Sequence, residues 1–474
     1  MRRQCSAPLE VVFRGLVLTA VLVLASSWLA AAQTANPFLG SVPTGEATGS
    51  ILDLSLSDAF ERALRYNLGA IESRENTRAA HAARLRSLNA LLTTVTGRVS
   101  ASVNQINLQA LGFNLTIPGV SISPVVGPFH VNDARVFVTQ ELFNWSDIQS
   151  LKSSSESERA SQLSYQSDRD LVVFTTGGAY LLVISDEAAV DSIRAQVRTA
   201  QALYDQGVDK NAQGVIARID VLRARVELQT QQQRLIAAEN QLRIDKLSLA
   251  RVIGLPNGQD FRPTDTVPYR ALEDLTVEQS LAQAYAIRPD YLAAQRQVTA
   301  AELASRAATA EAYPSGSLAA DYGRIGNPNF SAAHGTYTVS AAVNIPILLG
   351  SRVRADKLQA ESTLAQRRAE LADLRGRIND QVRTALYNLK SSSELVAVAQ
   401  SNIDLANETL TQAQNRLAAG VANNLEVVQA QESVAAANQS YIASLYAFNV
   451  AKIALAQTLG VAERSAVAYL LGRP

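Results

Sequence analysis

Few residues in this chain could carry chemistry, and they are widely separated. The three histidines are His81, His130 and His334, and the only cysteine is Cys5. Without a second thiol or a His-x-Glu cluster, these residues do not form the usual ligand set of a transition metal. The sequence also lacks a Walker A lysine motif. We therefore predict no catalytic residues, no metal site and no cofactor, and no energy supply from nucleotide hydrolysis by the chain itself.

Two carboxylates occupy equivalent positions, each six residues after the glycine of a Gly-Val pair. Asp220 follows Gly214-Val215, and Glu426 follows Gly420-Val421. If helices begin after these pairs, each carboxylate lies near a helix N-terminus, where it stabilises the helix by about 0.3–1 kcal/mol. Any further role depends on the elements that position them.

The composition bounds the class of protein. The chain has 474 residues, 43 Lys+Arg, 43 Asp+Glu and 47% hydrophobic residues. It is too polar for a helical membrane protein and long enough for several ordinary domains. Its neutral net charge argues against a nucleic-acid partner, which would require a basic patch or stripe.

Residues 1–32 have the pattern of a secretory signal peptide. Arg2, Arg3 and Arg14 precede the apolar run from Leu16 to Leu29, and Ala30-Ala31-Ala32 supplies small residues for cleavage. A membrane anchor is the alternative, but the uncharged run is marginal for a span. Because Gln33 and not cysteine follows, we expect no lipid attachment, and cleavage removes Cys5.

Proline is missing from two long parts of the chain, between Pro128 and Pro256 and between Pro346 and Pro474. Since proline costs about 3 kcal/mol inside a helix, these stretches allow very long helices. The stretch from Asp147 to Ala212 has 66 residues and as a helix would reach on the order of 100 Å. A generic coiled-coil rod would also explain such helices.

Four short segments alternate apolar and polar residues with period two, as strands with two different faces do. The clearest contain Val95, Val99 and Val103, and Tyr337, Val339 and Val343; the others surround Val136 and Ala320. No later apolar run is long enough for a spanning helix, so a membrane crossing would require a closed β-barrel. Four strands are too few to close one.

Internal repetition indicates that the chain is a duplication. Leu54-Ser55 and Leu275-Thr276 each open a predicted capping box, at an offset of 221 residues. From Gly214 and Gly420 the two copies align without a gap at an offset of 206, with Val221 matching Val427 and Lys246 matching Lys452. A second pair, Gly207-Val208, is an alternative first turn, but only Gly214 keeps this alignment free of gaps.

Each copy is predicted to contain a short helix, a second helix, a strand hairpin, a very long helix and a return helix. The predicted helices span 55–66, 68–92, 147–212 and 216–253 in the first copy, and 276–287, 289–312, 350–418 and 424–458 in the second. The predicted domains are a signal peptide 1–32, an N-terminal linker 33–51, a first repeat 52–254 with strands at about 95–106 and 133–143 and a helical hairpin 147–253, an inter-repeat linker 255–274, a second repeat 275–460 with strands at about 315–323 and 335–347 and a helical hairpin 350–458, and a C-terminal tail 461–474.

This ordered set resembles the TolC-like outer-membrane efflux proteins from about residue 52 to residue 460. The tip motifs Ile219-Asp220-Val221-Leu222 and Leu425-Glu426-Val427-Val428 look like the family's periplasmic turns. Tyr313-Pro314-Ser315 and Ile345-Pro346-Ile347-Leu348-Leu349-Gly350 look like its entry to and exit from the barrel. The first copy departs from this pattern, with Thr93 and Glu141 in the places of Pro314 and Pro346.

The resemblance implies a mainly α fold with a β-barrel section: a trimeric α-barrel tunnel topped by a twelve-stranded β-barrel, with four strands from each chain. Closure among three chains would remove every strand edge. The implied location is the outer membrane, with the helices in the periplasm and the barrel in contact with lipid. The implied function is a passive exit duct, with a periplasmic adaptor and an inner-membrane pump of RND or ABC type as partners.

The resemblance also places site residues at the helical tips. Glu426 would form a ring of three carboxylates around the pore, with Asp220 and Arg218 as the polar residues of the first copy; like charges in a narrow mouth favour cations. The positions that usually carry further aperture residues hold Leu417, Ala422 and Gln429. The exposed turns are the candidates for adaptor docking: Gly214, Val215, Ile216, Gly420, Val421 and Ala422. The glycines could instead serve only the tight reversal.

Two other classes compete with the duct. A structural or adhesive coiled-coil protein would explain the helices but not the strand hairpins. A periplasmic adaptor would need lipoyl-like domains and would not be duplicated. The first hairpin loop, 107–129, is apolar and proline-containing and would face outside the cell.

Overall fold

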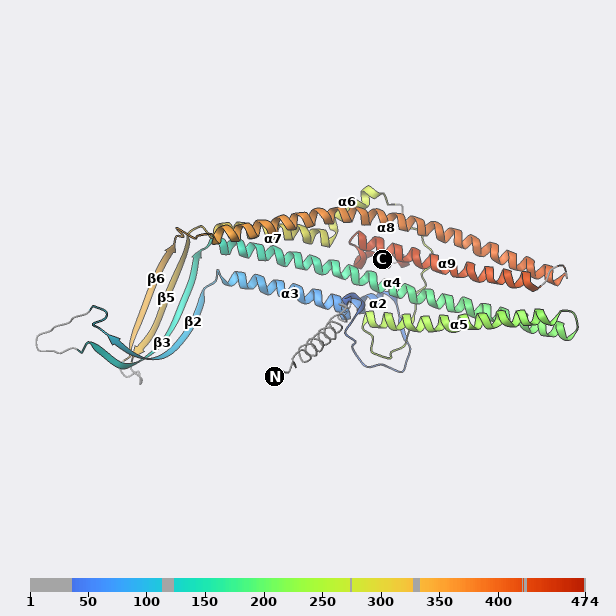
Figure 1. The fold of residues 1–474 in the computed structure, drawn as a ribbon, viewed down its shortest axis with the longest axis horizontal. Helices are drawn as coiled ribbons and strands as arrows, with labels where there is room; N and C mark the ends of the chain where they lie inside the picture. The colour runs from blue at the N-terminus through green and yellow to red at the C-terminus, as the bar shows by residue number, and fades with distance from the viewer. Residues whose placement is uncertain are drawn as a thin grey trace, which may run out of the picture. The chain divides into compact units, whose positions relative to one another are not determined.

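The computed structural model describes residues 36–112, 123–272, 275–326, 333–419, 421 and 424–472 (Figure 1). The predicted signal peptide lies outside these residues. The chain divides into two compact units. The sheet unit comprises Glu75–Tyr165 and Pro289–Ile378, and the hairpin unit comprises the described residues before Glu75, the segment Gln166–Arg288 and those after Ile378.

The helices lie where the duplicated pattern predicts them, with bounds that differ by at most three residues. The first copy contains α2 (Leu56–Tyr66), α3 (Leu68–Asn89), α4 (Trp145–Ala212) and α5 (Arg218–Ile253). The second contains α6 (Val277–Ile287), α7 (Pro289–Ala310), α8 (Arg352–Ala418) and α9 (Asn424–Thr458). Both predicted capping boxes form, through Ser55 with Asp58 and Thr276 with Gln279. Local capping therefore fixes the start of each copy.

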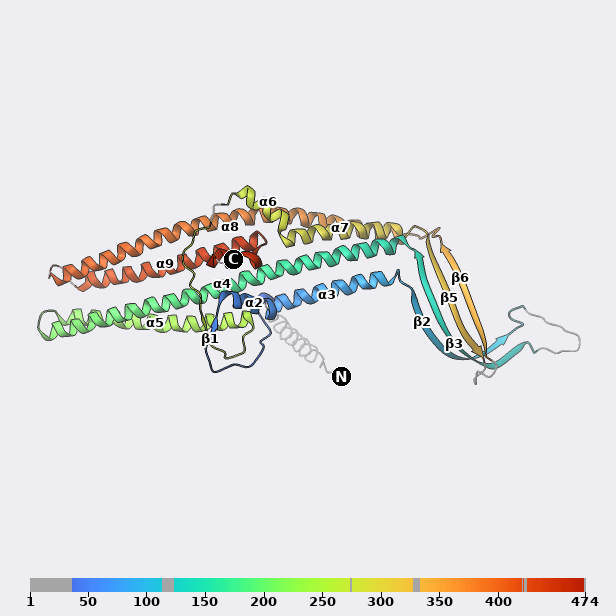
Figure 2. The same cartoon turned by 180° about the vertical axis from the view of Figure 1, so that it is seen from behind.

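The strands of the sheet unit form one antiparallel sheet in the order β2-β3-β5-β6 (Figure 2). Their bounds are β2 (Thr94–Asn107), β3 (Val125–Phe143), β5 (Ser315–Gly326) and β6 (His334–Asn344). Pairing of β3 with β5 joins the hairpin of the first copy to that of the second. Within the described chain, β2 and β6 each pair along one edge only.

Three predicted strand bounds are wrong. β5 ends at Gly326 and not near residue 323. β3 begins at Val125 and not near residue 133, because Val125 and Val126 extend the ladder with β2 beyond an irregularity at Asn104. β6 ends at Asn344 and not at residue 347. Pro346 has no N–H to donate, and it restricts the residue before it, so the ladder stops there.

The core of the hairpin unit gathers residues from both copies. Buried side chains from α2, α4, α5 and α9 meet in it, among them Phe60, Tyr180, Ile253 and Ile453. The Tyr180 hydroxyl donates to the Leu54 carbonyl oxygen at 2.9 Å. α4 contains a stretch apolar enough for a membrane span by length and composition, but its residues, such as Val172 and Val183, lie in this core. We therefore interpret α4 as a core helix.

The predicted linkers and tail are structured. Parallel strands β1 (Leu52–Leu54) and β4 (Phe261–Pro263) pair, and a 3-10 helix, η1 (Pro37–Leu39), precedes them. The chain after residue 460 forms α10 (Ala462–Leu471), which packs on α9 and buries Ala462, Ala466 and Leu470. Its four-residue spacing of apolar residues is a helical signal that the prediction of a tail missed.

Candidate functional site: the two-faced sheet and the helical tips

The sheet has one mainly apolar face. Cross-strand partners lie on the same side of a sheet, and alternate residues point to opposite sides. Val95, Val138, Ala320 and Val339 form one row, and Val136, Tyr322 and Tyr337 belong to the next. The tyrosines and most of these valines are exposed in the single chain. This face therefore offers an apolar surface across all four strands.

The opposite face is polar and contains an ion network. Arg135 of β3 contacts Asp133 on its own strand at 2.9 Å and Asp321 of β5 at 2.8 Å. Arg98 of β2, the register partner of Arg135, lies over the ring of Phe137, 5.0 Å from its centroid. The Arg135–Asp321 pair thus links the hairpins of the two copies. Sequence analysis did not single out these residues, although their alternation placed them on the polar face.

The first tip is a helix C-terminus closed by Gly214. The Gly214 N–H donates to the Asn211 carbonyl oxygen at 2.9 Å, and the Val215 N–H donates to that of Lys210 at 2.9 Å. These two bonds define a Schellman motif, whose C′ residue is left-handed, and Gly214 has φ +73°. The side chain of Asn211 completes the turn with a bond to the Ile216 carbonyl oxygen at 2.8 Å. Gly207 lies inside α4, so the choice of Gly214 is confirmed.

The second tip repeats part of this geometry. The Val421 N–H donates to the Arg416 carbonyl oxygen at 3.0 Å, which is the bond made by Val215 in the first copy. Gly420 and Ala422 lie outside the described residues. Val215 and Val421 are 66% and 67% exposed. The two turns therefore present equivalent apolar side chains to solvent.

The charged residues at the two tips pair differently. Glu426 accepts from Arg416 across the turn, at 3.2 Å to Nε and 3.4 Å to Nη2. Asp220 lies 3.5 Å from Arg223, one turn along the same helix. Arg218 is exposed. Sequence analysis missed Arg416, whose place four residues before Gly420 was the available signal.

The other two predicted aperture residues have different surroundings. Leu417 is half-buried and packs on a small cluster formed by Ala413, Val427 and Ala430. Gln429 is exposed, and its carbonyl oxygen accepts a hydrogen bond from the Ser433 hydroxyl at 3.0 Å. Leu417 thus helps to hold α8 against α9, whereas Gln429 is open to solvent.

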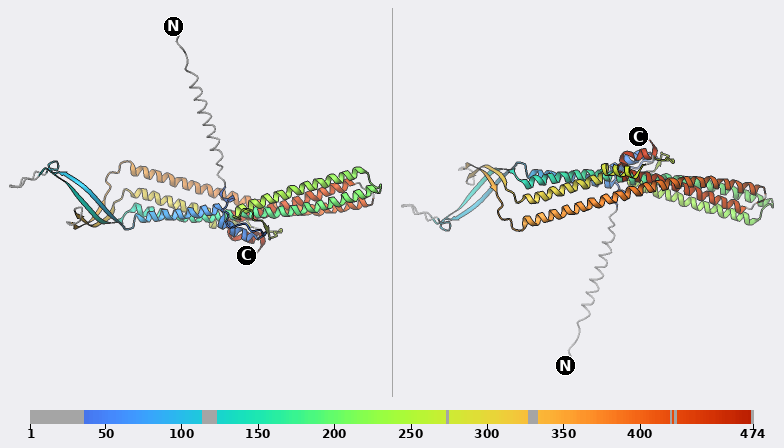
Figure 3. Two further views of the ribbon diagram at one scale, coloured as in Figure 1. Left: turned by 90° about the horizontal axis from the view of Figure 1, so that it is seen from below. Right: turned by 90° about the horizontal axis from the view of Figure 1, so that it is seen from above.

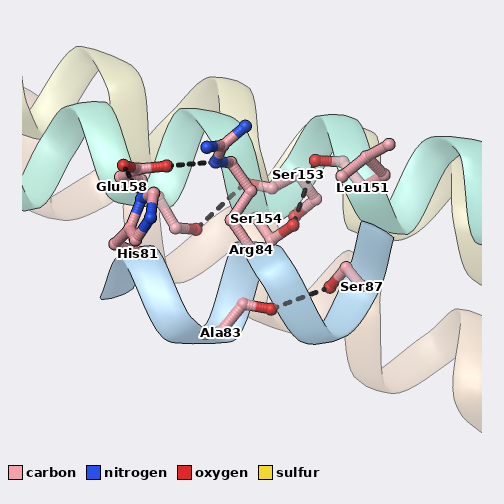
Figure 4. Close-up of polar contacts among 9 residues, drawn as sticks. His81, Ala83, Arg84, Ser87, Leu151, Ser153, Ser154 and Glu158 are labelled. Carbon is pink, nitrogen blue, oxygen red and sulfur yellow. Dashed lines mark hydrogen bonds and ion pairs between the residues drawn. The ribbon is translucent and has the colours of Figure 1, made fainter. Parts of the chain in front are cut away.

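The histidines are not brought together. His81 of α3 contacts Glu158 of α4 at 2.8 Å, and Arg84 contacts the same carboxylate at 2.5 Å (Figure 4). These contacts lower the pKa of Glu158 against the opposing effect of burial. His130 of β3 pairs with Val103 of β2, and His334 of β6 pairs with Ile325 of β5. Among the described residues, no group of three potential ligands could hold a metal ion.

A duplicated pair of long helical hairpins joined to a two-faced sheet defines a class of outer-membrane channel. The profile of the outer membrane efflux protein family matches residues 67–255 and 280–461. The chain therefore belongs to the outer membrane efflux protein family, which confirms the resemblance seen in the sequence and places it among outer-membrane proteins.

Individual relatives are distant. The chain is 20% identical over 343 residues to outer membrane protein TolC of Escherichia coli, covering 70% of each. It is 23% identical over 259 residues to nodulation protein T of Rhizobium leguminosarum bv. trifolii, covering 52% of this chain and 54% of the relative. It also matches 49% of the pyoverdine export outer membrane protein OpmQ of Pseudomonas putida. The chain thus spans about half the length of these last two relatives.

Solved structures share the fold. The CmeC outer membrane channel of Campylobacter jejuni superposes with a TM-score of 0.74 at 15% identity, covering 90% of this chain and 92% of that one. The open MtrE channel of Neisseria gonorrhoeae gives a TM-score of 0.71 at 17% identity, covering 89% and 95%. The predicted fold class, long helices with an antiparallel sheet section, is confirmed.

Proposed function

We propose that the protein is the outer-membrane exit duct of a tripartite efflux or secretion system. Substrates would pass from an inner-membrane pump of RND or ABC type, through a periplasmic adaptor, into this duct and out of the cell. The two-faced sheet carries the proposal. Its valine- and tyrosine-rich face suits lipid, and the face with Arg135 and Asp321 suits a watery lumen.

The duct is proposed to be a homotrimer. Lipid leaves an unpaired strand edge without hydrogen-bond partners, at a cost of several kcal/mol for each unsatisfied group. In the described chain, β2 and β6 each have one such edge. Pairing β6 of one chain with β2 of the next, three times, closes twelve strands and removes every edge.

The helical tips are proposed to carry the periplasmic contacts. The exposed turn residues Val215 and Val421, with Ile216 and the neighbouring Gly214, Gly420 and Ala422, form the proposed docking surface for the adaptor. Two equivalent turns in each chain would give six related sites in a trimer.

Glu426 is proposed to influence ion selectivity at the aperture, together with Asp220, Arg218 and Gln429. The pair with Arg416 offsets part of its charge. Replacing Arg416 with alanine should therefore increase the preference for cations, whereas Glu426→Ala and Glu426→Lys should decrease it. Single-channel recordings in planar bilayers measure this. Unchanged selectivity in all three variants would remove Glu426 from the pore.

The duct itself is tested with the purified protein in detergent. Light scattering, corrected for bound detergent, should give the mass of three chains, and the same preparation should conduct ions in planar bilayers. A stable monomer would contradict the architecture. A trimer that conducts no ions would favour a structural or adhesive role.

A further inference from the structure

The apolar face of the sheet contains a pair of neighbouring tyrosines. On this face β5 presents Leu318, Ala320 and Tyr322 in turn, and Tyr322 pairs with Tyr337 of β6. The two tyrosines are 66% and 77% exposed. Tyrosines gather where the apolar band of a membrane barrel meets the polar headgroups of the lipid. This row of the sheet therefore marks a candidate surface of the bilayer.

The next residue on the same face of β5 is Arg324. It pairs with Ala134 of β3 and Gly335 of β6, two residues beyond the tyrosine row on each strand. On β3 the same face continues with Asn132 and His130, whereas β2 stays apolar, and the strands of a barrel tilt relative to the bilayer. On β3 and β5 this face thus changes from apolar to polar just beyond the tyrosines.

Arg324 lies near the end of β5 that is farthest from the helices. The strand begins soon after α7 ends, and Arg324 is two residues before its last residue, Gly326. In Figures 1 and 3 the yellow and orange strands β5 and β6 extend away from α7 and α8. With the helices in the periplasm, this end of the sheet reaches the outer leaflet of the membrane.

The apolar surface continues from the tyrosine row toward the helices. The strand residues from Tyr337 to Val343 rise by about 16 Å if β6 tilts by about 40°. Past the end of β6, Ile347 and Leu348 are 94% and 90% exposed, and the chain from Val343 to Ile347 can add about 10 Å. A barrel presents an apolar band about 25 Å tall to lipid. The tyrosine row therefore fits the outer border of this band.

The guanidinium of Arg324 has N–H groups available for a ligand. Among the described residues it makes one hydrogen bond, from Nη2 to the Ala333 carbonyl oxygen at 3.2 Å, and no ion pair. Arginine has five N–H donors, and Arg324 is exposed. A guanidinium on the lipid face is costly at the middle of the bilayer and is tolerated near its surface. There its planar fork matches the oxygens of a phosphate group.

We propose that Arg324 binds a phosphate group of lipopolysaccharide, the phosphorylated glycolipid of the outer leaflet. The guanidinium donates two parallel hydrogen bonds to the phosphate oxygens, and the rings of Tyr322 and Tyr337 pack against the lipid on the membrane side. A trimer then carries three such sites. The inference rests on the proposed function, because it requires the apolar face of the sheet to meet lipid.

The test is titration of lipopolysaccharide into the purified full-length protein in a non-ionic detergent, with the bound lipid counted by native mass spectrometry. We expect saturable binding of up to three molecules per trimer. Arg324→Gln should weaken the affinity by roughly tenfold, the usual effect of removing a hydrogen bond to a charged group. Arg324→Lys keeps the charge but not the fork and should bind with intermediate affinity.

Arg98→Gln is the matched control. Arg98 belongs to the row next to that of Arg324 but lies on the opposite, polar face of the sheet. The variant therefore loses the same charge at nearly the same height, and its affinity for lipopolysaccharide should be unchanged. A tenfold loss in Arg98→Gln as well would show that the effect does not depend on the face, and it would overturn the proposal.

A measurement on the unmutated protein makes the test independent of any folding defect in a variant. Lipopolysaccharide from which the lipid A phosphates have been removed should bind roughly tenfold more weakly than the intact form. Equal binding of the two forms, or equal affinity of Arg324→Gln and the unmutated protein, would overturn the proposal. A trimer that conducts ions but fails these tests would still be the proposed duct, so the two failures are distinguishable.

Discussion

The two helical hairpins share a backbone design but differ in the chemistry of equivalent side chains. Val215 and Val421 make the same turn bond, to Lys210 and Arg416 respectively. Lys246 and Lys452, also equivalent, have opposite surroundings. Lys246 contacts Glu187 at 3.2 Å and the Phe261 carbonyl oxygen at 3.0 Å. Duplication has therefore kept the turns and allowed the helix interfaces to diverge.

Lys452 is the clearest example of this divergence. It is 0% exposed, and its Nζ has no hydrogen-bond partner among the residues that the structure describes. The Lys452 Nζ lies over the Phe448 ring, 4.9 Å from its centroid. Burial, together with the charge of Arg270, lowers the pKa of Lys452 to about 8. Where the first copy has Glu187, the second has a serine, Ser392 or Ser393.

The largest expected effect comes from exchanging these two lysines for methionine. Lys452→Met removes a buried ammonium that no described residue pairs with and should raise the free energy of unfolding by about 1–4 kcal/mol. Lys246→Met leaves Glu187 and the Phe261 carbonyl oxygen without their donor and should lower it by about 1–3 kcal/mol. Thermal unfolding in detergent measures both. Shifts of the same sign would show that the two sites do not differ as described.

Gly214, the turn glycine, should matter more for stability than Gly207, the other candidate for the turn. Gly214 has φ +73°, and a Cβ there would meet open space, so Gly214→Ala should cost only the backbone strain of about 1–2 kcal/mol. Gly207 lies inside α4, so Gly207→Ala should be neutral or stabilising by up to about 1 kcal/mol. Comparison of their melting temperatures tests the position of the turn. A larger loss from Gly207→Ala would place the turn there.

A carboxylate pair should make the first hairpin sensitive to pH. Burial, then the hydrogen bond and charge of Asp245, raise the pKa of Asp186 to about 7. The nearby Tyr446 of α9 has its pKa raised by burial and by both carboxylates. The second hairpin has a serine and Ala451 at the positions of Asp186 and Asp245. The carboxylate pair, and the pH dependence expected from it, therefore occur in the first hairpin and not at the equivalent positions of the second.

The sign follows from the raised pKa. Between the ordinary value of about 4 and 7, the folded protein binds more protons than the unfolded chain, so this group's contribution to the free energy of unfolding falls as the pH rises. Asp245→Asn should bring the pKa of Asp186 closer to normal and reduce that fall. The difference between the melting temperatures at pH 5 and pH 8, compared between the unmutated protein and Asp245→Asn, measures this fall. An identical pH dependence in the variant would argue against the pair.

The smallest expected effect concerns the tip charges. The side chains of Arg416 and Glu426 are 54% and 45% exposed, so Glu426→Gln should change the free energy of unfolding by less than about 1 kcal/mol. Asp220→Asn, which breaks a pair within one helix and removes a carboxylate from its first turn, should also change it by less than about 1 kcal/mol. Thermal unfolding at low and high salt checks both. A loss of several kcal/mol from Glu426→Gln would indicate a structural role.

Much of the fold was predictable, and less of the site. Period-two alternation and missing prolines located β2, β3, β5, β6 and the long helices, because these signals depend on neighbours in sequence. The partners of Glu426 and Arg135 were not predicted, since each ion pair depends on the geometry of a turn or on the register of two strands. The paired strands β1 and β4 were missed because each has only three residues, too few for a periodic pattern.

The sequence by itself determined the order of helices and strands and the capping boxes, which depend on residues within a few positions of one another. It also determined the duplication and the turn at Gly214, because the same local pattern recurs at a constant offset in the second copy. Only the tertiary structure decided that β3 pairs with β5, that Asp186 faces Asp245 and that Lys452 is buried with no hydrogen-bond partner in the described part of the chain. These features arise where distant segments pack, and the energy of a buried charge depends on which side chains the packing places beside it.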